Sequence, residues 1–209
     1  VVETHGYTSG NAQLAIQRLE HIARWRRIVE LSNPGSRLPV NGVQLEIELP
    51  AGNDAWKPAP PGEVIRLEYT LQDGKWKKPY FRIKLANRSK LRLYCLVFDL
   101  TEVYGVEPIL PGGGLWLEPG QETWANAGDP IYASIPQQLW QAGLTQLNDT
   151  LLLVVSTDES DAMQLAQDDL PATYSRSRST KSVSRMNTLN RLMHRVGTRN
   201  FSIRPDDDE

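Results

Sequence analysis

The hydrophobic period of the chain changes after Pro34, and this change constrains the fold more than any other feature. From Val43 onward, apolar and polar residues alternate with a period of two, the pattern of a strand with one buried face. About eight short segments of this kind follow one another, separated by glycine and proline turns, with few helical segments between them. Such a succession is mainly β and predicts an antiparallel β-sandwich, Ig-like or C2-like, and not an α/β fold.

The expected strands differ in how their apolar residues are distributed. Residues 91–100 and 151–156 are apolar on both faces, so we expect them at the centre of a sheet. The other expected strands are residues 43–49, 65–71, 81–85, 106–110, 115–117, 122–125 and 131–135. A single helical turn is expected at residues 137–141 and a short helix at residues 163–170.

Before Pro34 the period is that of a helix. Apolar residues recur at steps of three and four over residues 11–31, which predicts one long amphipathic helix. Ser9 or Asn11 is expected to cap its start, and Asn33-Pro34 to end it. We expect its apolar face, from Ala12 to Val29, to pack on the core. The arginines of the opposite face are expected to be solvated.

Near Ser160 the composition changes again. Residues 174–185 are rich in serine and arginine without apolar periodicity, and we expect a flexible linker open to cleavage or modification at Arg176, Arg178, Lys181 and Arg185. Leu189, Leu192 and Met193 belong to a short amphipathic segment that could dock on a protein. The expected organisation is a helix packed on the core (1–35), a β-sandwich (36–160), and a linker with a short helix and an acidic tail (161–209).

The overall charge and the cysteine content limit the classes of protein to which this chain can belong. A formal net charge of −2 provides no general attraction to nucleic acid or acidic lipid. Cys95, which lies in an apolar strand, is the one cysteine of the chain. A single cysteine excludes a disulfide framework, and this favours a cytoplasmic location. No apolar run approaches the length of a membrane span. Since the chain begins with Val1 and has no signal-peptide pattern, we expect a part of a longer cytoplasmic protein.

Residues able to carry catalysis are few and scattered. His5 lies in the terminal segment, His21 on the expected amphipathic helix and His194 beyond the linker. Cys95 lies in an apolar strand without an activating partner, so we expect no Cys–His dyad. The sequence has no paired-cysteine or His-Glu-x-x-His motif, so we expect neither a metal nor another cofactor. We therefore expect that this chain is not an enzyme. One enzymatic alternative stays open, a carboxylate-dependent hydrolase that uses Asp99 or Glu102.

Two binding hypotheses come from the residues themselves. Trp116, Trp124 and Trp140 lie close together in sequence; tryptophan is common in cores and enriched at interfaces, and core or loop packing is favoured. Residues 174–204 are basic and could contact phosphates, but they contain almost no aromatic residues, so binding of nucleic acid is the weaker alternative.

Several motifs resemble a C-terminal accessory β-sandwich domain of bacterial caspase-like proteins. They are Leu93-Tyr94-Cys95-Leu96-Val97-Phe98-Asp99-Leu100-Thr101-Glu102, Leu110-Pro111, Leu117-Glu118-Pro119-Gly120 and residues 151–158, with Leu19-Glu20-His21-Ile22-Ala23-Arg24-Trp25 and Leu189-Asn190-Arg191-Leu192-Met193. The hosts are cyanobacterial orthocaspase and metacaspase relatives, and the resemblance covers residues 10–199. It implies a regulatory or recruiting role through protein–protein contact. The partner would be a caspase-fold protease domain or its substrate, and no catalytic residue carries over.

Overall fold

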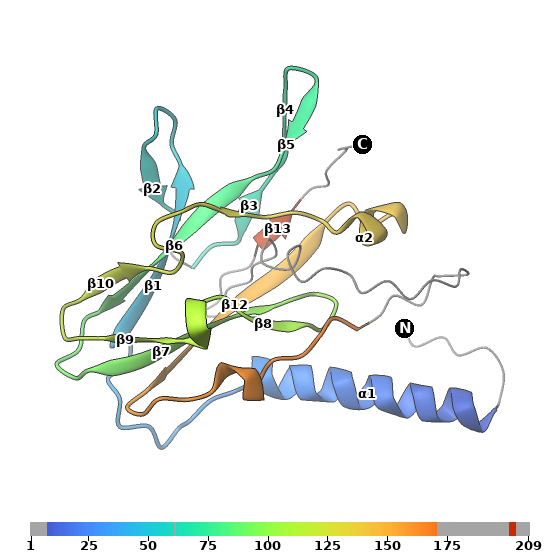
Figure 1. Ribbon diagram of the computed structural model, residues 1–209, viewed down its shortest axis with the longest axis horizontal. Helices are drawn as coiled ribbons and strands as arrows, with labels where there is room; N and C mark the ends of the chain where they lie inside the picture. Colours follow the sequence, from blue (N-terminus) through green and yellow to red (C-terminus); the bar gives the residue numbers. More distant parts are fainter. Residues whose placement is uncertain (1–7, 61, 171–200, 204–209) are drawn as a thin grey trace.

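A computed structural model describes residues 8–60, 62–170 and 201–203 of the chain, the last three only as backbone. The fold is mainly β, with antiparallel sheets preceded by one long helix, as the alternating pattern predicts. Figure 1 shows two sheets one above the other, with the N-terminal helix along the far side of the second sheet.

The first sheet has the strand order β10-β6-β1-β2, and β11 also pairs with β6. Its strands are β1 (Val43–Pro50), β2 (Trp56–Pro58), β6 (Tyr80–Asn87), β10 (Glu122–Trp124) and β11 (Ile131–Tyr132). The long antiparallel pair at its centre sets Val43 opposite Asn87 and Glu48 opposite Arg82. This register places the apolar residues of both strands on one face.

The second sheet has the order β3-β13-β12-β7-β8, and β9 also pairs with β7. Its strands are β3 (Ile65–Leu67), β7 (Leu93–Leu100), β8 (Val106–Pro108), β9 (Leu115–Leu117), β12 (Leu147–Ser156) and β13 (Phe201–Ile203). Its central pair sets Thr150 opposite Leu100 and Ser156 opposite Tyr94. As predicted from their apolar character, β7 and β12 lie inside this sheet. Two further strands, β4 (Thr70–Gln72) and β5 (Lys75–Lys77), form a separate hairpin.

The core lies between the two sheets. Ile47, Phe81 and Leu85 of the first sheet and Val97 and Leu151 of the second belong to one cluster of fully buried side chains. Burial of such side chains is the main favourable term in folding. Two sheets that share one core are compatible with the expected sandwich.

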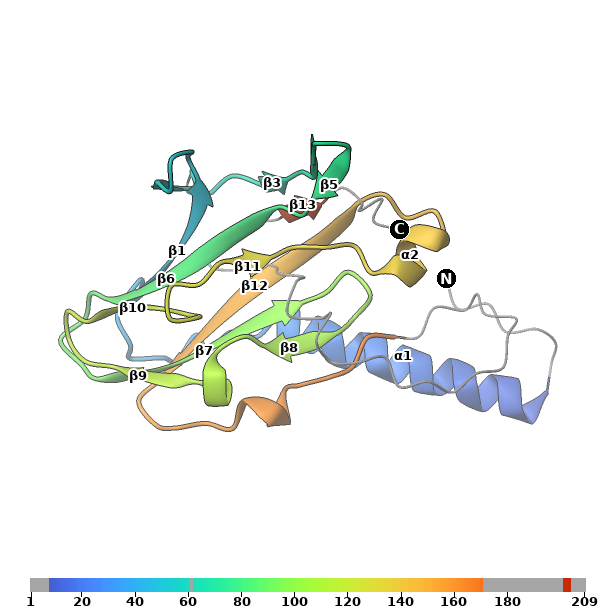
Figure 2. The same cartoon turned by 45° about the horizontal axis from the view of Figure 1, so that its top comes forward.

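The outer face of the second sheet is covered by α1 (Ser9–Val29) and a short 3-10 turn, η2 (Ala162–Gln164). Trp25, Ile28 and Val29 pack over Phe98 and Leu152. The helix is also held by hydrogen bonds to backbone carbonyls: Trp25 Nε1 donates to Gly105 and Arg24 Nη2 donates to Gln164. Figure 2 shows the C-terminal half of α1 beneath the sheet and its N-terminal half extending beyond it.

Several sequence expectations for the helices need correction. Thr8 caps α1, since its hydroxyl accepts a hydrogen bond from the Asn11 N–H, so neither Ser9 nor Asn11 is the cap. Ile16 and Leu19 are 57% and 59% exposed, although the periodicity predicts that they pack on the core. Both residues lie on the side of α1 that is turned away from the packed side chains Trp25, Ile28 and Val29, so the second sheet does not cover them. The helix expected over residues 163–170 is the single turn η2, whereas α2 (Gln137–Gln141) forms as predicted.

Candidate functional site

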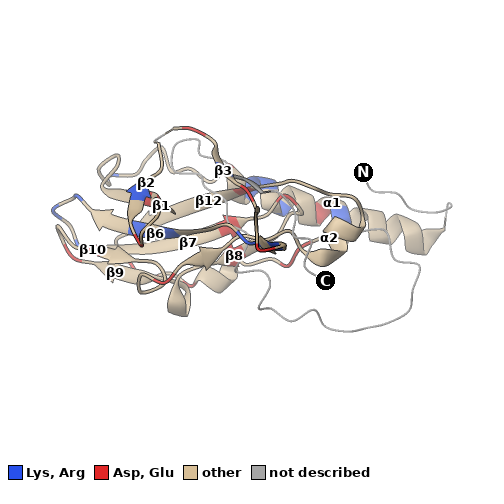
Figure 3. Ribbon diagram, turned by 90° about the horizontal axis from the view of Figure 1, so that it is seen from above, with Lys and Arg blue, Asp and Glu red and all other residues tan. Residues whose placement is uncertain are grey.

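The solvent face of the first sheet carries an organised set of aromatic and charged side chains. Because Phe81, Ile83 and Leu85 of β6 point into the core, Tyr80, Arg82 and Lys84 between them point outward. The register sets Arg82 opposite Glu48 and Lys84 opposite Glu46 on β1. Figure 3 shows basic residues on β6 beside acidic residues on β1.

Arg82 is the centre of this set. Its guanidinium carbon lies 4.3 Å from the ring centre of Trp56 on β2 and 4.1 Å from that of Trp124 on β10. Its Nε and Nη2 both lie 2.8 Å from Glu48 Oε2. The guanidinium therefore lies against two indole rings and is neutralised by a carboxylate. This geometry combines cation–π attraction with charge-assisted hydrogen bonds.

The arrangement continues in both directions along β6. Towards one end, Lys84 pairs with Glu122, and Arg88 Nη2 lies 2.7 Å from Glu122 Oε1. The hydrogen bond from Lys84, and then that from Arg88, lowers the pKa of Glu122 below its ordinary value.

At the other end, the Tyr80 ring meets Trp56 edge-on at 5.8 Å. Tyr132 lies 5.6 Å from Tyr80 and is 44% exposed. We name the whole set the aromatic face. It comprises Trp56, Tyr80, Arg82, Lys84, Trp124 and Tyr132, with Glu48 and Glu122.

The composition of this face is typical of protein interfaces. Trp, Tyr and Arg are the residue types enriched where a few side chains carry most of the binding energy. Their mutual stacking fixes the rotamers of Trp56, Arg82 and Trp124 before any partner arrives. A surface ordered in advance loses less conformational entropy on binding.

The three tryptophans named in the sequence lie in three different places, and each is half-buried. Trp124 belongs to the aromatic face. Trp116 lies under Arg92 at 4.5 Å on the second sheet, 5.1 Å from Tyr94, whose pKa is raised by burial and by the nearby Glu159 and Asp161. Trp140 of α2 packs against the core, as expected. The other predicted contact residues lie outside the described residues: Arg176, Arg178, Lys181, Arg185, Leu189, Leu192 and Met193.

Sequence reasoning missed most of the aromatic face. Trp56, Tyr80, Arg82 and Tyr132 are not among the residues that the sequence predicts for binding, and β2 falls between the expected strands. One signal is present: Tyr80, Arg82 and Lys84 occupy the polar face of a strand, where smaller polar residues would suffice for solubility. What the sequence does not contain is the strand order, which brings Trp56 and Trp124 to the two sides of Arg82.

The groups considered for catalysis are either buried, as Asp99 and Cys95 are, or lie against backbone groups, as Glu102 and His21 do. Asp99 is buried, and Glu102 Oε2 accepts a 2.6 Å hydrogen bond from the Asn148 N–H. Burial raises the pKa of the Cys95 thiol to about 12, so the thiolate is not formed near neutrality. His21 Nε2 lies 3.1 Å from the Tyr104 carbonyl. Within the described part of the chain, His, Cys, Asp and Glu side chains form no group able to hold a metal ion.

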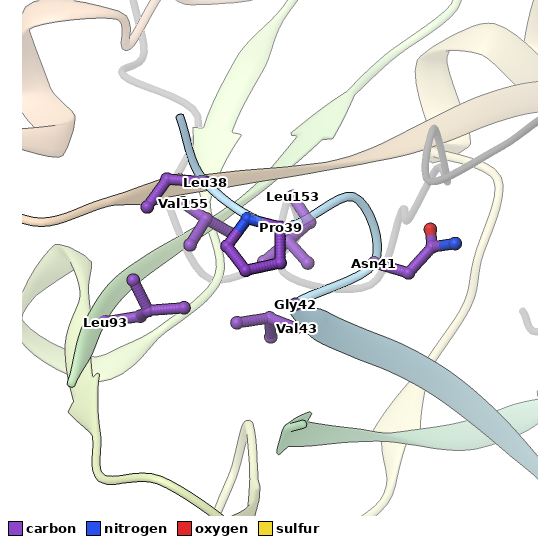
Figure 4. A pocket seen from close by; sticks show the side chains of 8 residues that line it. All are labelled: Leu38, Pro39, Asn41, Gly42, Val43, Leu93, Leu153 and Val155. Carbon is purple, nitrogen blue, oxygen red and sulfur yellow. The ribbon is translucent and has the colours of Figure 1, made fainter. Parts of the chain in front are cut away.

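A small apolar pocket opens at one end of the two sheets, where β1 begins and β12 ends. It has a volume of about 190 Å³. Its lining residues, seen in Figure 4, are Leu38, Pro39, Asn41, Gly42, Val43, Leu93, Leu153 and Val155. The volume is below that of usual small-molecule sites and suits a single aliphatic side chain.

Comparison of the chain with protein-family models, curated proteins and solved structures finds no match. Among the described residues, no helix has the length and apolar character required to cross a membrane.

Proposed function

We propose that this chain is a non-catalytic protein-binding module and that the aromatic face is its docking surface. The observation that carries the proposal is the stacking of Trp56, Arg82 and Trp124 on the outer face of the first sheet. Tryptophan is costly to expose to water, and the five strands β1, β2, β6, β10 and β11 contribute side chains to this face. Binding a protein surface would use both the apolar area and the polar rim.

The sequence resemblance supports a proposal for the partner. We propose a caspase-fold protease domain, which the module would regulate or supply with substrate, in the cytoplasm. Tyr132 is the member of the face most open to a partner. The guanidinium of Arg82 is already neutralised by Glu48, so complex formation would add little unpaired buried charge.

The experiment is an affinity purification from extracts of the native cells, with the tagged 209-residue chain as bait and partners identified by mass spectrometry. A caspase-fold polypeptide is the expected partner, and its affinity is then measured with purified proteins. Trp124→Ala and Tyr132→Ala should each weaken binding by roughly tenfold or more. Leu71→Ala is the matched control, because Leu71 is 61% exposed on the separate β4–β5 hairpin.

Two results would overturn the proposal. Failure to recover a caspase-fold polypeptide removes the assigned partner. Recovery of that polypeptide with equal affinity for Trp124→Ala, Tyr132→Ala and the unchanged chain removes the assigned face.

A further inference from the structure

The outward face of α1 carries an apolar stripe that packs on no part of the described chain. Ala12, Ile16, Leu19 and Ala23 recur at steps of four, three and four residues, so they lie on one side of the helix. With about 100° per residue, this side is opposite to the one through which Trp25 packs on the second sheet. All four residues are exposed, and Ile16 and Leu19 retain 57% and 59% of their surface.

The order of residues within the stripe is symmetric. Two alanines stand at its ends and two large aliphatic residues at its middle, so reversing its direction gives the same small-large-large-small order. A two-fold axis between Ile16 and Leu19 would place each against the other in a second copy, and Ala12 against Ala23. Such self-complementarity is what a symmetric dimer interface requires. The alanines would let the helix backbones approach closely at both ends of the contact.

The charges of α1 select this antiparallel arrangement. Residues 8–17 carry no charged side chain, whereas Arg18, Arg24, Arg26 and Arg27 all follow them with a single carboxylate, Glu20, so the C-terminal half of α1 is strongly basic. In a parallel pair the arginines of both copies would lie side by side and repel. In an antiparallel pair the arginines of each copy lie beside the uncharged turns of the other.

We infer that the outward face of α1 is a self-association surface, on which a second copy of this chain docks through its own α1 in antiparallel orientation. The stripe lies on the side of α1 turned away from the sheet, and its N-terminal part belongs to the half of the helix that extends past the sheet (Figure 2), so the β body of its own chain does not cover it. It is separate from the aromatic face, which lies on the other sheet. Four short side chains from each copy bury less area than a permanent dimer needs, so the association is weak and reversible.

The test is sedimentation velocity of the full 209-residue chain over a range from about 1 µM to several hundred µM, the range of weak contacts of this size. The weight-average mass should rise from 23.6 kDa towards twice that value. The double variant Ile16→Glu, Leu19→Glu should stay monomeric throughout. The control Leu71→Glu alters an equally exposed aliphatic residue far from α1 and should associate like the unchanged chain. Circular dichroism checks that each variant is folded.

Orientation is tested by cysteine pairing, which is possible because the native Cys95 is buried. A mixture of Ile16→Cys and Leu19→Cys chains under mild oxidation should give mainly the mixed disulfide. A monomeric unchanged chain at all concentrations, or a double variant that associates equally, overturns the inference. A preference for Ile16→Cys self-pairing overturns the antiparallel arrangement. None of these outcomes depends on a protease partner, so they are distinct from the test of the proposed function.

Discussion

The guanidinium carbon of Arg82 lies 4.1 Å from the ring centre of Trp124, a residue 42 positions away on the neighbouring strand β10. On its other side the same guanidinium meets Trp56 of β2 at 4.3 Å. Among the described strands, β2 and β10 each pair with one neighbour, and each has only three residues. Arg82 thus connects the two short outer strands of the first sheet through side chains, where backbone pairing is limited.

This connection predicts that Arg82→Ala destabilises the fold. The change removes two cation–π contacts and leaves Glu48, itself half-buried, without its partner at 2.8 Å. We expect a loss of about 1–3 kcal/mol in the free energy of unfolding, measured by urea denaturation. Arg82→Lys keeps the charge but not the planar stacking group. Its free energy of unfolding should therefore lie between that of the unchanged chain and that of Arg82→Ala.

Arg88→Ala is the control for this prediction. Arg88 also pairs with a glutamate, but its side chain is 45% exposed, and exposed ion pairs contribute little. We expect a change below about 0.5 kcal/mol. Equal losses for Arg82→Ala and Arg88→Ala would mean that the stacking contributes nothing.

Asn87, at the end of β6, is predicted to be a main determinant of the connection to β7. Its buried side chain makes four hydrogen bonds: Nδ2 donates to the carbonyls of Leu91 and Leu117, and Oδ1 accepts from the backbone N–H and the hydroxyl of Ser89. Asn87→Asp replaces the donating amide with an oxygen that faces two carbonyls. We expect a loss of about 2–4 kcal/mol, seen in thermal and urea unfolding. Asn53→Asp, at an exposed turn, serves as the control and should be nearly neutral.

Gly114 is predicted to be required by close packing and not by backbone conformation. Its backbone is extended, with φ of −170°, which any residue can adopt. A Cβ at this position would lie 2.6 Å from both Leu96 Cδ2 and the Tyr94 hydroxyl. Gly114→Ala should therefore cost about 1–3 kcal/mol through overpacking. Gly10→Ala in α1 meets nothing within 4 Å and should be neutral or slightly stabilising. A neutral Gly114→Ala variant would show that the Tyr94 ring moves aside freely.

Much of the β architecture is determined by local pattern. Alternation predicted β1 and β6, because a strand buried on one face alternates apolar and polar residues. Continuous apolar runs predicted β7 and β12 as inner strands, because a strand buried on both faces has apolar residues on both. The strand expected over residues 65–71 is broken into β3 and β4 at Glu68 and Tyr69. Tyr69 is buried, and its hydroxyl accepts a hydrogen bond from the Ile135 N–H, a long-range contact that periodicity cannot show.

The aromatic face and the exposed stripe of α1 could not be predicted for related reasons. Trp56 and Trp124 meet Arg82 only because β2 and β10 lie on opposite sides of the β1–β6 pair. Ile16 and Leu19 have the spacing of packed residues, but tertiary packing through Trp25 and Ile28 decides which side of α1 faces the sheet. Strands of three residues, such as β2 and β5, are also too short to show a period.

Cys95 gives a prediction for pH. Burial raises the pKa of its thiol from an ordinary value of 9.0 to about 12, so the folded protein holds this proton more tightly than the unfolded chain. Between these two values the unfolded chain has lost the proton and the folded protein has kept it, so stability falls as pH rises from about 9 towards 12. Cys95→Ala should remove this part of the alkaline loss, measured as the urea midpoint against pH.

In the unchanged chain at about pH 8, near the ordinary pKa of a thiol, Cys95 should react with a disulfide reagent only after unfolding. Prompt reaction of the native protein would show that the strand opens readily around Cys95.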